Sequence, residues 1–263
     1  ISSALFPSPT FEDWKQVSQA GYDCVELSVQ AHNNFNGAEE YLAPGEKMVQ
    51  DIQNAELAIW SLHIPFGRKW DIASPDEFER QRVVKEIITL LKQSKHWGYK
   101  VAVIHGSTEP VDSNEREKCL QQSKLSIREV GQYCQDNEIS LALECLPRSC
   151  LGNTIREIEY LIEGTEVKVC FDVNHLLKES HEEFINQLGK FIVTTHLSDY
   201  DGIDERHWVP GIGIIDWQKL YSGFAKVGYT GPLLFEVANR PLPDGEKVTP
   251  EKILTSFKDE ITV

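Results

Sequence analysis

The sequence predicts an α/β fold: a (β/α)8 barrel with eight parallel strands, forming a single domain over residues 1–263. Three observations support this prediction. A length of 263 residues is ordinary for such a barrel. Short apolar segments alternate with longer segments of helical spacing, which is the pattern of repeated strand–helix units. No stretch rich in proline, serine or glycine divides the chain into two parts.

Eight short apolar segments, rich in β-branched residues, are the expected strands. They span residues 2–6, 24–28, 59–64, 101–105, 140–144, 167–172, 192–198 and 232–237. Because helical segments separate most of them, the strands are expected to run parallel, each joined to the next by a crossover helix.

Two of the intervening segments, residues 78–97 and 115–134, have apolar side chains three and four positions apart, as amphipathic helices do. Their apolar faces are expected to cover the outside of the barrel. Gly21, Gly98 and Gly228 each stand between a helical segment and an expected strand. Glycine readily adopts the left-handed conformation that ends a helix, so each should lie at a helix C-terminus.

Two long irregular segments, residues 65–74 and 198–216, each follow an expected strand. In α/β barrels the loops after the strands build the active site. Functional side chains are therefore expected in these loops and at the C-terminal ends of the strands.

The composition argues against nucleic acid and membranes as partners. The formal net charge is -15 and the pI is about 5.0, whereas nucleic-acid binding relies on clustered Lys and Arg. No apolar run approaches the ~20 residues that span a bilayer, and the first residues lack the layout of a signal peptide. Six cysteines form no CxxC pair. Reduced thiols in a cytoplasmic protein are the expectation.

Seven of the eight expected strands carry a carboxylate or an imidazole at or near the C-terminal end. These residues are Glu26, His63, His105, Glu144, Asp172, His196 and Glu236. A single residue of this kind is more often structural than functional. Seven that converge on one end of one barrel instead predict a functional site.

Three of these residues, Glu144, Asp172 and Glu236, would place negative charges together in a partly dry pocket, which is costly without a compensating cation. No arginine or lysine occupies these strand ends. Together with the imidazole of His196, the carboxylates can supply the ligands of one divalent metal ion. Mn²⁺ is the expected ion, with Mg²⁺, Co²⁺ and Zn²⁺ as alternatives.

The order and spacing of these motifs resemble the xylose-isomerase-like superfamily of TIM barrels. The resemblance is carried by Leu143-Glu144, Phe171-Asp172-Val173-Asn174-His175, Thr195-His196-Leu197-Ser198-Asp199, His207 before Pro210-Gly211-Ile212-Gly213, and Phe235-Glu236. The superfamily includes sugar and sugar-phosphate isomerases and epimerases, inosose dehydratases and DNA-repair enzymes of the endonuclease IV type.

The resemblance implies a metal-dependent sugar or sugar-phosphate isomerase or epimerase. In ketose 3-epimerases of this group, the positions matched by Glu144, Asp172, His196 and Glu236 bind the metal, and the two glutamates also act as acid and base. They would remove and return a proton next to a carbonyl through a metal-stabilised enediolate. The residues expected to bind a small carbohydrate substrate are Glu26, His63, His105, His175, Arg206 and His207.

Two other activities remain open. All nine positions that bind three zinc ions in endonuclease IV have matches here: His63, His105, Glu144, Asp172, His175, His196, Glu205, His207 and Glu236. The net charge argues against the hypothesis of an endonuclease IV-like zinc phosphodiesterase, and Glu205 stands where that enzyme type has aspartate. An inosose-type dehydratase would begin with the same proton abstraction. A homo-oligomer is compatible with the sequence, which leaves the oligomeric state open.

Overall fold

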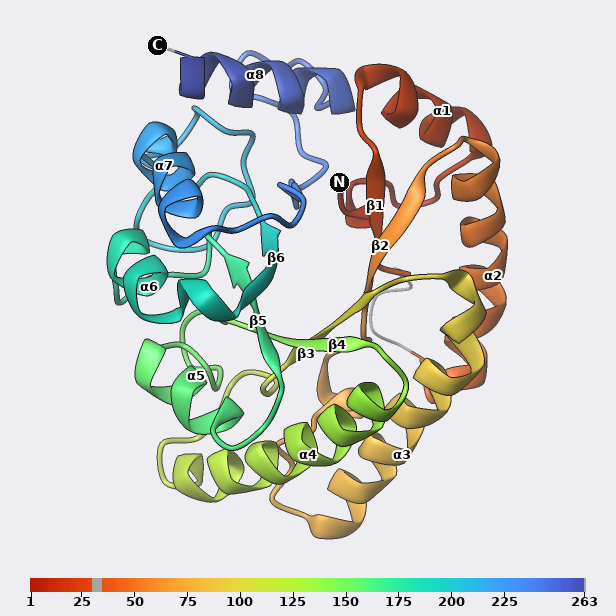
Figure 1. Cartoon of the computed structure of the whole chain (residues 1–263), viewed down its shortest axis with the longest axis vertical. Helices are drawn as coiled ribbons and strands as arrows, with labels where there is room; N and C mark the ends of the chain where they lie inside the picture. The colour runs from red at the N-terminus through yellow and green to blue at the C-terminus, as the bar shows by residue number, and fades with distance from the viewer. Residues whose placement is uncertain (30–34, 263) are drawn as a thin grey trace.

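The computed structural model describes residues 1–29 and 35–262. Six strands form one parallel sheet in chain order, with helices around its outside (Figure 1). The strands are β1 (Cys24–Leu27), β2 (Ala58–His63), β3 (Val101–His105), β4 (Ser140–Glu144), β5 (Lys168–Asp172) and β6 (Ile192–His196). The predicted α/β barrel class is confirmed.

The prediction of regular strands at residues 2–6 and 232–237 is wrong. Each segment makes one isolated parallel bridge, between Ser2 and Glu26 and between Phe235 and Leu197. The Ser2 N–H also donates to the Phe235 carbonyl at 2.7 Å. These two segments therefore connect β6 back to β1 and occupy the positions of the two missing strands.

Side chains explain why these segments stop short of a strand ladder. The Ser2 hydroxyl accepts a hydrogen bond from the Ala4 N–H at 3.3 Å, and the chain turns into the short 3-10 helix η1 (Ser3–Leu5). At the other end, the Leu234 N–H donates to the Thr195 hydroxyl at 3.2 Å. A side chain thus replaces a backbone acceptor where the ladder would continue.

Eight α-helices surround the sheet in the described part of the chain. They are α1 (Phe11–Ala20), α2 (Ala38–Asn54), α3 (Glu77–Ser94), α4 (Arg116–Asp136), α5 (Ile155–Ile162), α6 (His181–Leu188), α7 (Trp217–Val227) and α8 (Pro250–Thr262). The 3-10 helices η2 (Arg68–Trp70), η3 (Lys95–Trp97) and η4 (Gly189–Phe191) complete the elements. The helices predicted over residues 78–97 and 115–134 are confirmed as α3 with η3 and as α4.

Three helices end at the glycines where the sequence predicted a helix end. Gly21, Gly98 and Gly228 follow α1, η3 and α7 with φ values of 97°, 89° and 72°, the left-handed conformation that a side chain would disfavour. The last helix, α8, lies beside α1 (Figure 1), where the Tyr22 hydroxyl donates to the Pro250 carbonyl at 3.0 Å. The first and last helices thus meet on the outside of the barrel.

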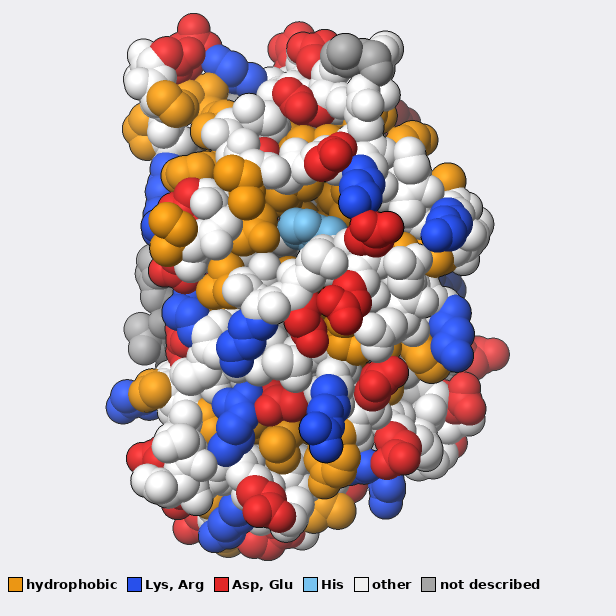
Figure 2. Space-filling model, turned by 90° about the vertical axis from the view of Figure 1, so that its left-hand side faces the viewer, with side chains coloured by type: hydrophobic (Ala, Val, Ile, Leu, Met, Phe, Trp, Pro, Cys, Tyr) orange, Lys and Arg blue, Asp and Glu red, His pale blue; other side chains and the backbone are white. Residues whose placement is uncertain are grey.

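One face of the molecular surface carries side chains of both charges. On the face drawn in Figure 2, Lys and Arg side chains are interspersed with Asp and Glu side chains. In residues 1–29 and 35–262, no helix has the length and apolar character needed to cross a bilayer.

The period-two alternation of the strands sets the position of the site. Val101 and Val103 of β3, Ala142 of β4 and Cys170 of β5 form a small buried cluster separate from the large core between sheet and helices. Residues two positions further along a strand point to the same face. His105, Glu144 and Asp172 therefore share the face of this inner cluster, one layer nearer the C-terminal ends of the strands.

The long loop after β6 is held by one buried carboxylate. Asp199 is fully buried, and its side chain accepts hydrogen bonds from the Tyr200, Gly211 and Ile215 N–H groups and from the Trp217 indole, at 2.9 to 3.2 Å. Because these donors come from both ends of the loop, Asp199 fixes the path of the segment that carries Glu205 and His207.

Candidate active site

Glu144, the last residue of β4, lies at the centre of the predicted constellation. Its Oε1 is 3.2 Å from His196 Nδ1, while its Oε2 is 3.2 Å from His63 Nε2 and 3.1 Å from His105 Nε2. The sheet register explains these contacts, since His105 pairs with Glu144 in the β3–β4 ladder. One carboxylate therefore connects histidines from β2, β3 and β6.

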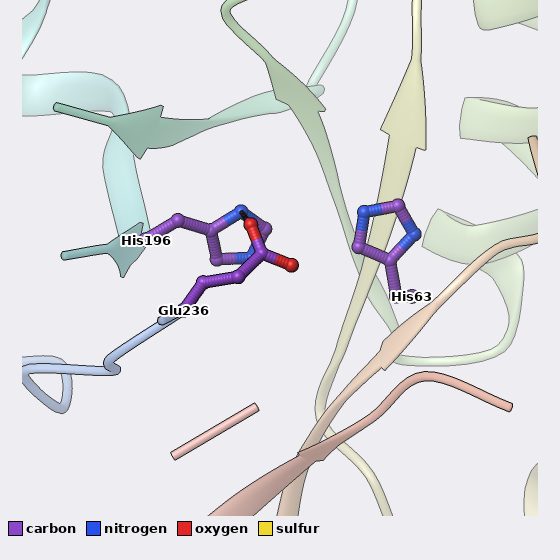
Figure 3. A group of neighbouring side chains, drawn as sticks. All are labelled: His63, His196 and Glu236. Atoms are coloured by element: carbon purple, nitrogen blue, oxygen red, sulfur yellow. Dashed lines mark ion pairs between the residues drawn. The ribbon is translucent and has the colours of Figure 1, made fainter. Parts of the chain in front are cut away.

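The four predicted metal ligands come together. Glu144, Asp172, His196 and Glu236 each offer one ligand atom, and these four atoms lie within 4.8 Å of one another. His196 Nδ1 is 3.2 Å from Glu236 Oε2 and 3.7 Å from Asp172 Oδ2. Figure 3 shows the rings of His196 on β6 and His63 on β2 next to each other, stacked with a centroid distance of 5.7 Å, and the Glu236 carboxylate beside the His196 ring.

One buried oxygen supports the fit of a cation to this group. Oδ1 of Asp172 accepts a hydrogen bond from the Asn174 N–H at 2.7 Å, but within the described residues Oδ2 is buried without any hydrogen-bond partner. A buried unpaired carboxylate oxygen is costly. Three carboxylates and one imidazole form a donor set suited to Mn²⁺, Mg²⁺, Co²⁺ or Zn²⁺. The residues present therefore fit a divalent cation.

The pKa values of the buried groups are shifted by their charged neighbours in the cluster. Burial opposes the charged form of His63, but the hydrogen bond and the charge of Glu144 outweigh it and raise the pKa of His63 to about 9. Burial likewise opposes ionisation of Glu144, yet His196 and His105 hold the pKa of this carboxyl well below its usual range. Burial raises the pKa of Asp172 to about 6, against the pull of His175 and His207. Without a metal ion, protonated histidines supply the positive charge that the carboxylates require.

A chain of charged contacts leads from this cluster to the surface. His175 Nδ1 donates to the Cys145 carbonyl at 3.0 Å, and His175 Nε2 lies 3.1 Å from Glu205 Oε2. The other oxygen of Glu205 accepts a hydrogen bond from Arg148 at 2.9 Å. Arg148 also bonds to Glu109, and to Asp204 at 2.8 Å. Arg148 thus joins the loops that follow β3, β4 and β6.

Two further groups of ligand atoms overlap the first. They are His63, His105 and Glu144 on one side and Asp172, His175 and His207 on the other. Glu205 adjoins the second group through its contact with His175. All nine residues matched to the endonuclease IV zinc ligands are therefore brought together in one place.

The cluster opens into a cavity of about 690 Å³ at the C-terminal ends of the strands. The predicted site residues that line it are His63, His105, Glu144, His175, His207 and Glu236. Phe66 also lines it, with its ring stacked on His105 at a centroid distance of 4.3 Å. The cavity thus presents both proposed proton-transfer glutamates, four histidines and one aromatic wall.

Four predicted site residues are absent from the described lining of this cavity: Glu26, Asp172, His196 and Arg206. Asp172 and His196 lie behind it in the buried ligand group. Arg206 instead forms an ion pair with Asp201 of the same loop, with 2.7 Å between Nη2 and Oδ2. Glu26 is fully buried and contacts His196 and Ser61.

Sequence reasoning did not identify Glu109 as part of the site. Glu109 lines the cavity and pairs with Arg148, which is 39 positions away in the chain. Arg148 forms ion pairs with three carboxylates. Its positive φ of 48°, uncommon for a non-glycine residue, has no signal in the sequence.

Comparisons with known proteins agree with the barrel fold. A family model described as "Xylose isomerase-like TIM barrel" matches residues 14–256. The uncharacterised protein MJ1311 of Methanocaldococcus jannaschii is 24% identical over 251 residues, covering 91% of this chain and 83% of that protein.

Solved structures resemble the chain over nearly its full length. The crystal structure of a D-tagatose 3-epimerase-like protein has a TM-score of 0.80 at 21% identity and covers 99% of this chain and 97% of its own. A D-psicose 3-epimerase from Clostridium cellulolyticum H10, solved with D-tagatose, has a TM-score of 0.75 at 18% identity and covers 99% and 94%. At these identities the likeness establishes the fold.

Proposed function

Because the chain belongs to the xylose isomerase-like TIM barrel family, we propose that it is a divalent-metal-dependent sugar isomerase or epimerase. The observation that carries the proposal is the double role open to Glu144 and Glu236. Both belong to the four-residue ligand group, and both line the cavity. The names of the structurally similar 3-epimerases support the same class of reaction.

The proposed reaction moves a proton at a carbon next to a carbonyl group. A bound divalent cation would supply positive charge for the oxygen that becomes negative when the proton leaves. His196 and His105 hold the pKa of Glu144 well below its usual range, and His196 and His207 do the same for Glu236, in each case against burial. Both carboxylates are therefore ionised near neutral pH, and either can accept the proton.

The outcome depends on which glutamate returns the proton. If Glu236 removes it from one face of the carbon and Glu144 returns one to the other face, the product is an epimer. If a single glutamate moves it between neighbouring carbons, an aldose and a ketose interconvert. Phe66, stacked on His105, offers an apolar surface to the C–H face of a sugar ring or chain.

Solvent exchange tests this proposal directly. The protein, loaded with Mn²⁺, is incubated in D₂O with a panel of ketoses, ketose phosphates, inososes and hydroxypyruvate, and deuterium incorporation and products are measured. We expect exchange at a carbon next to the carbonyl for at least one sugar. Absence of exchange for every compound, in protein that binds the metal, would contradict the proposal.

Matched variants assign the exchange to the two glutamates. Glu144→Gln and Glu236→Gln are each expected to slow exchange by about 10²- to 10⁴-fold, the usual contribution of a positioned acid or base. Glu117→Gln, on the exposed surface of α4, is the control and should leave the rate unchanged. Unchanged exchange in either active-site variant would remove that residue from the mechanism.

Dehydration is the nearest chemical alternative, because loss of a β-hydroxyl can follow the same proton abstraction. Product analysis of the same reactions separates the two outcomes. An isomer or epimer retains the elements of water, whereas an inosose dehydratase releases a product lighter by one water.

A zinc phosphodiesterase is the second candidate, favoured by one specific observation. Eight of the nine residues matched to endonuclease IV form overlapping ligand groups around Glu144 and Asp172, and the ninth, Glu205, contacts His175. The net charge of -15 opposes approach to a phosphate backbone. Three bound zinc ions together with cleavage of abasic DNA would establish this function in place of the sugar reaction.

A further inference from the structure

Glu26, near the end of β1, is fully buried against His196. The register of β1 and β2 shifts between Val25 and Glu26, and the carboxylate of Glu26 lies 2.9 Å from His196 Nε2 through Oε1. Its other oxygen, Oε2, accepts a hydrogen bond from the Ser61 hydroxyl at 2.8 Å. Ser61 is also fully buried, so Glu26 is held from one side while it faces His196 on the other.

The two ring nitrogens of His196 face different groups. Nδ1 faces the candidate metal ligands, at 3.2 Å from Glu144 and 3.2 Å from Glu236, whereas Nε2 faces Glu26. Within the described chain, neither Nε2 nor Glu26 Oε1 has an aligned hydrogen bond, although the two atoms are close. At 2.9 Å, a hydrogen bond from the Nε2 N–H to this carboxylate oxygen would satisfy two buried polar atoms at once.

We propose that Glu26 is a positioning residue that orients His196 as a metal ligand, an inference that rests on the proposed metal-dependent function. By accepting a hydrogen bond from the Nε2 N–H, Glu26 keeps the ring proton on Nε2 and leaves the Nδ1 lone pair facing Glu144, Asp172 and Glu236. Carboxylates that bond to the second nitrogen of a metal-binding histidine fix its tautomer and its orientation. Ser61 in turn fixes the carboxylate of Glu26.

This role differs from the substrate contact expected from the sequence. Glu26 has no exposed surface and is not among the described residues that line the cavity. The Glu26 N–H donates to the Ile1 carbonyl at 3.0 Å, so its backbone belongs to the barrel wall. A residue in this position acts on the reaction through His196.

Calorimetric titration of metal-free protein with Mn²⁺ tests the proposal. Glu26→Gln keeps the size of the side chain and removes its charge. We expect its Mn²⁺ affinity to fall about 10- to 100-fold, the usual effect of losing such a partner, with the stoichiometry unchanged. Ser61→Ala should weaken binding in the same direction by a smaller factor, and Glu117→Gln should bind as the wild type does.

A second readout separates orientation from general damage to the fold. In Zn²⁺-loaded protein with ¹⁵N-labelled histidine, His196 should carry its proton on Nε2 and bind through Nδ1. That signature should be weakened or lost in Glu26→Gln. If Glu26→Gln does not fold, the Ser61→Ala titration and the wild-type tautomer decide the matter.

Wild-type Mn²⁺ affinity in Glu26→Gln, or an Nδ1 proton on wild-type His196, would overturn the role of Glu26. A wild-type protein that binds no metal would overturn both this role and the proposed function. Metal binding that depends on Glu26 in a protein without sugar turnover would refute only the proposed reaction.

Discussion

The Oε2 atom of Glu144 lies 3.2 Å from Nε2 of His63, although 81 positions separate the two residues. His63 also donates through Nδ1 to the Ile64 carbonyl at 3.0 Å, so both of its ring nitrogens face oxygen atoms. A protonated ring satisfies both contacts. In the metal-free protein, the cation that balances Glu144 is therefore partly a histidine side chain.

Stability of the metal-free protein should fall as the pH rises from about 6.5 to about 9. The pKa of His63 is about 9 in the fold, against an ordinary value of 6.5, so its contribution is complete below 6.5 and is lost as the pH passes 9. The pKa values of His175 and His196 are also raised, against burial, by neighbouring carboxylates, and they act in the same direction.

Urea unfolding across this pH range measures the effect. His63→Gln should flatten the dependence, whereas His96→Gln, which removes an exposed histidine of η3, should preserve it. A free energy of unfolding that rises between pH 6.5 and 9 in metal-free wild type would contradict the assignment.

Asp199→Asn should destabilise the loop after β6. The substitution replaces one acceptor oxygen by an amide group that faces N–H donors, so at least one buried donor loses its partner. A loss of about 1.5–3 kcal/mol in the free energy of unfolding is expected for hydrogen bonds to a charged group. Thermal unfolding measures it, with the exposed Asp23→Asn as the control; equal melting temperatures for the two variants would show that the loop does not depend on Asp199.

Arg148→Ala should affect the cavity more than the stability of the fold. Arg148 is partly exposed and bridges Glu109, Asp204 and Glu205, and partly exposed ion pairs contribute only about 1 kcal/mol or less each. The loss would release Glu205 from one of its two partners and loosen the cavity rim. We expect a KM raised severalfold, with unfolding shifted little; a large loss of stability with unchanged KM would contradict this reading.

A free sugar should be turned over more efficiently than its phosphate ester. Arg148 is already paired with three carboxylates, and two of these, Glu109 and Glu205, line the cavity. A phosphate group would face this negative charge, with Arg240 as the exposed cation of the rim. We expect kcat/KM for the ester to be lower by about tenfold, equivalent to ~1.4 kcal/mol. Preference for the ester, lost in Arg240→Ala, would assign the substrate to the phosphorylated class.

The sequence was most informative where one residue type carries a fixed geometric meaning. Parallel strands end on one side of a barrel, so Glu144, Asp172 and His196 could be placed together from their strand positions alone. The helix ends at Gly21, Gly98 and Gly228 could also be predicted, because glycine is the residue that most readily adopts the left-handed conformation found there.

Other features depend on tertiary contacts that a pattern does not contain. The segments around Ser2 and Phe235 have apolar strand-like sequences, but the Ser2 and Thr195 hydroxyls take hydrogen bonds that a ladder would need. The ion pair of Arg148 with Glu109 could not be predicted, because Glu109 follows a different strand. The contact of Glu26 with His196 joins the first and the sixth strand, and a strand pattern does not contain such a pairing. A cytoplasmic location and the oligomeric state stay predictions.

Titration of metal-free protein with Mn²⁺, in wild type and in Asp172→Asn, tests the central claim most directly. Asp172 supplies the buried Oδ2 atom that lacks a hydrogen bond within the described residues, so an amide there removes one anionic ligand and leaves the cavity lining intact. We predict one tightly bound ion per chain in the wild type and an affinity at least tenfold lower in Asp172→Asn. A wild type that binds no ion, or equal affinity in both proteins, would contradict a metal centre built from Glu144, Asp172, His196 and Glu236.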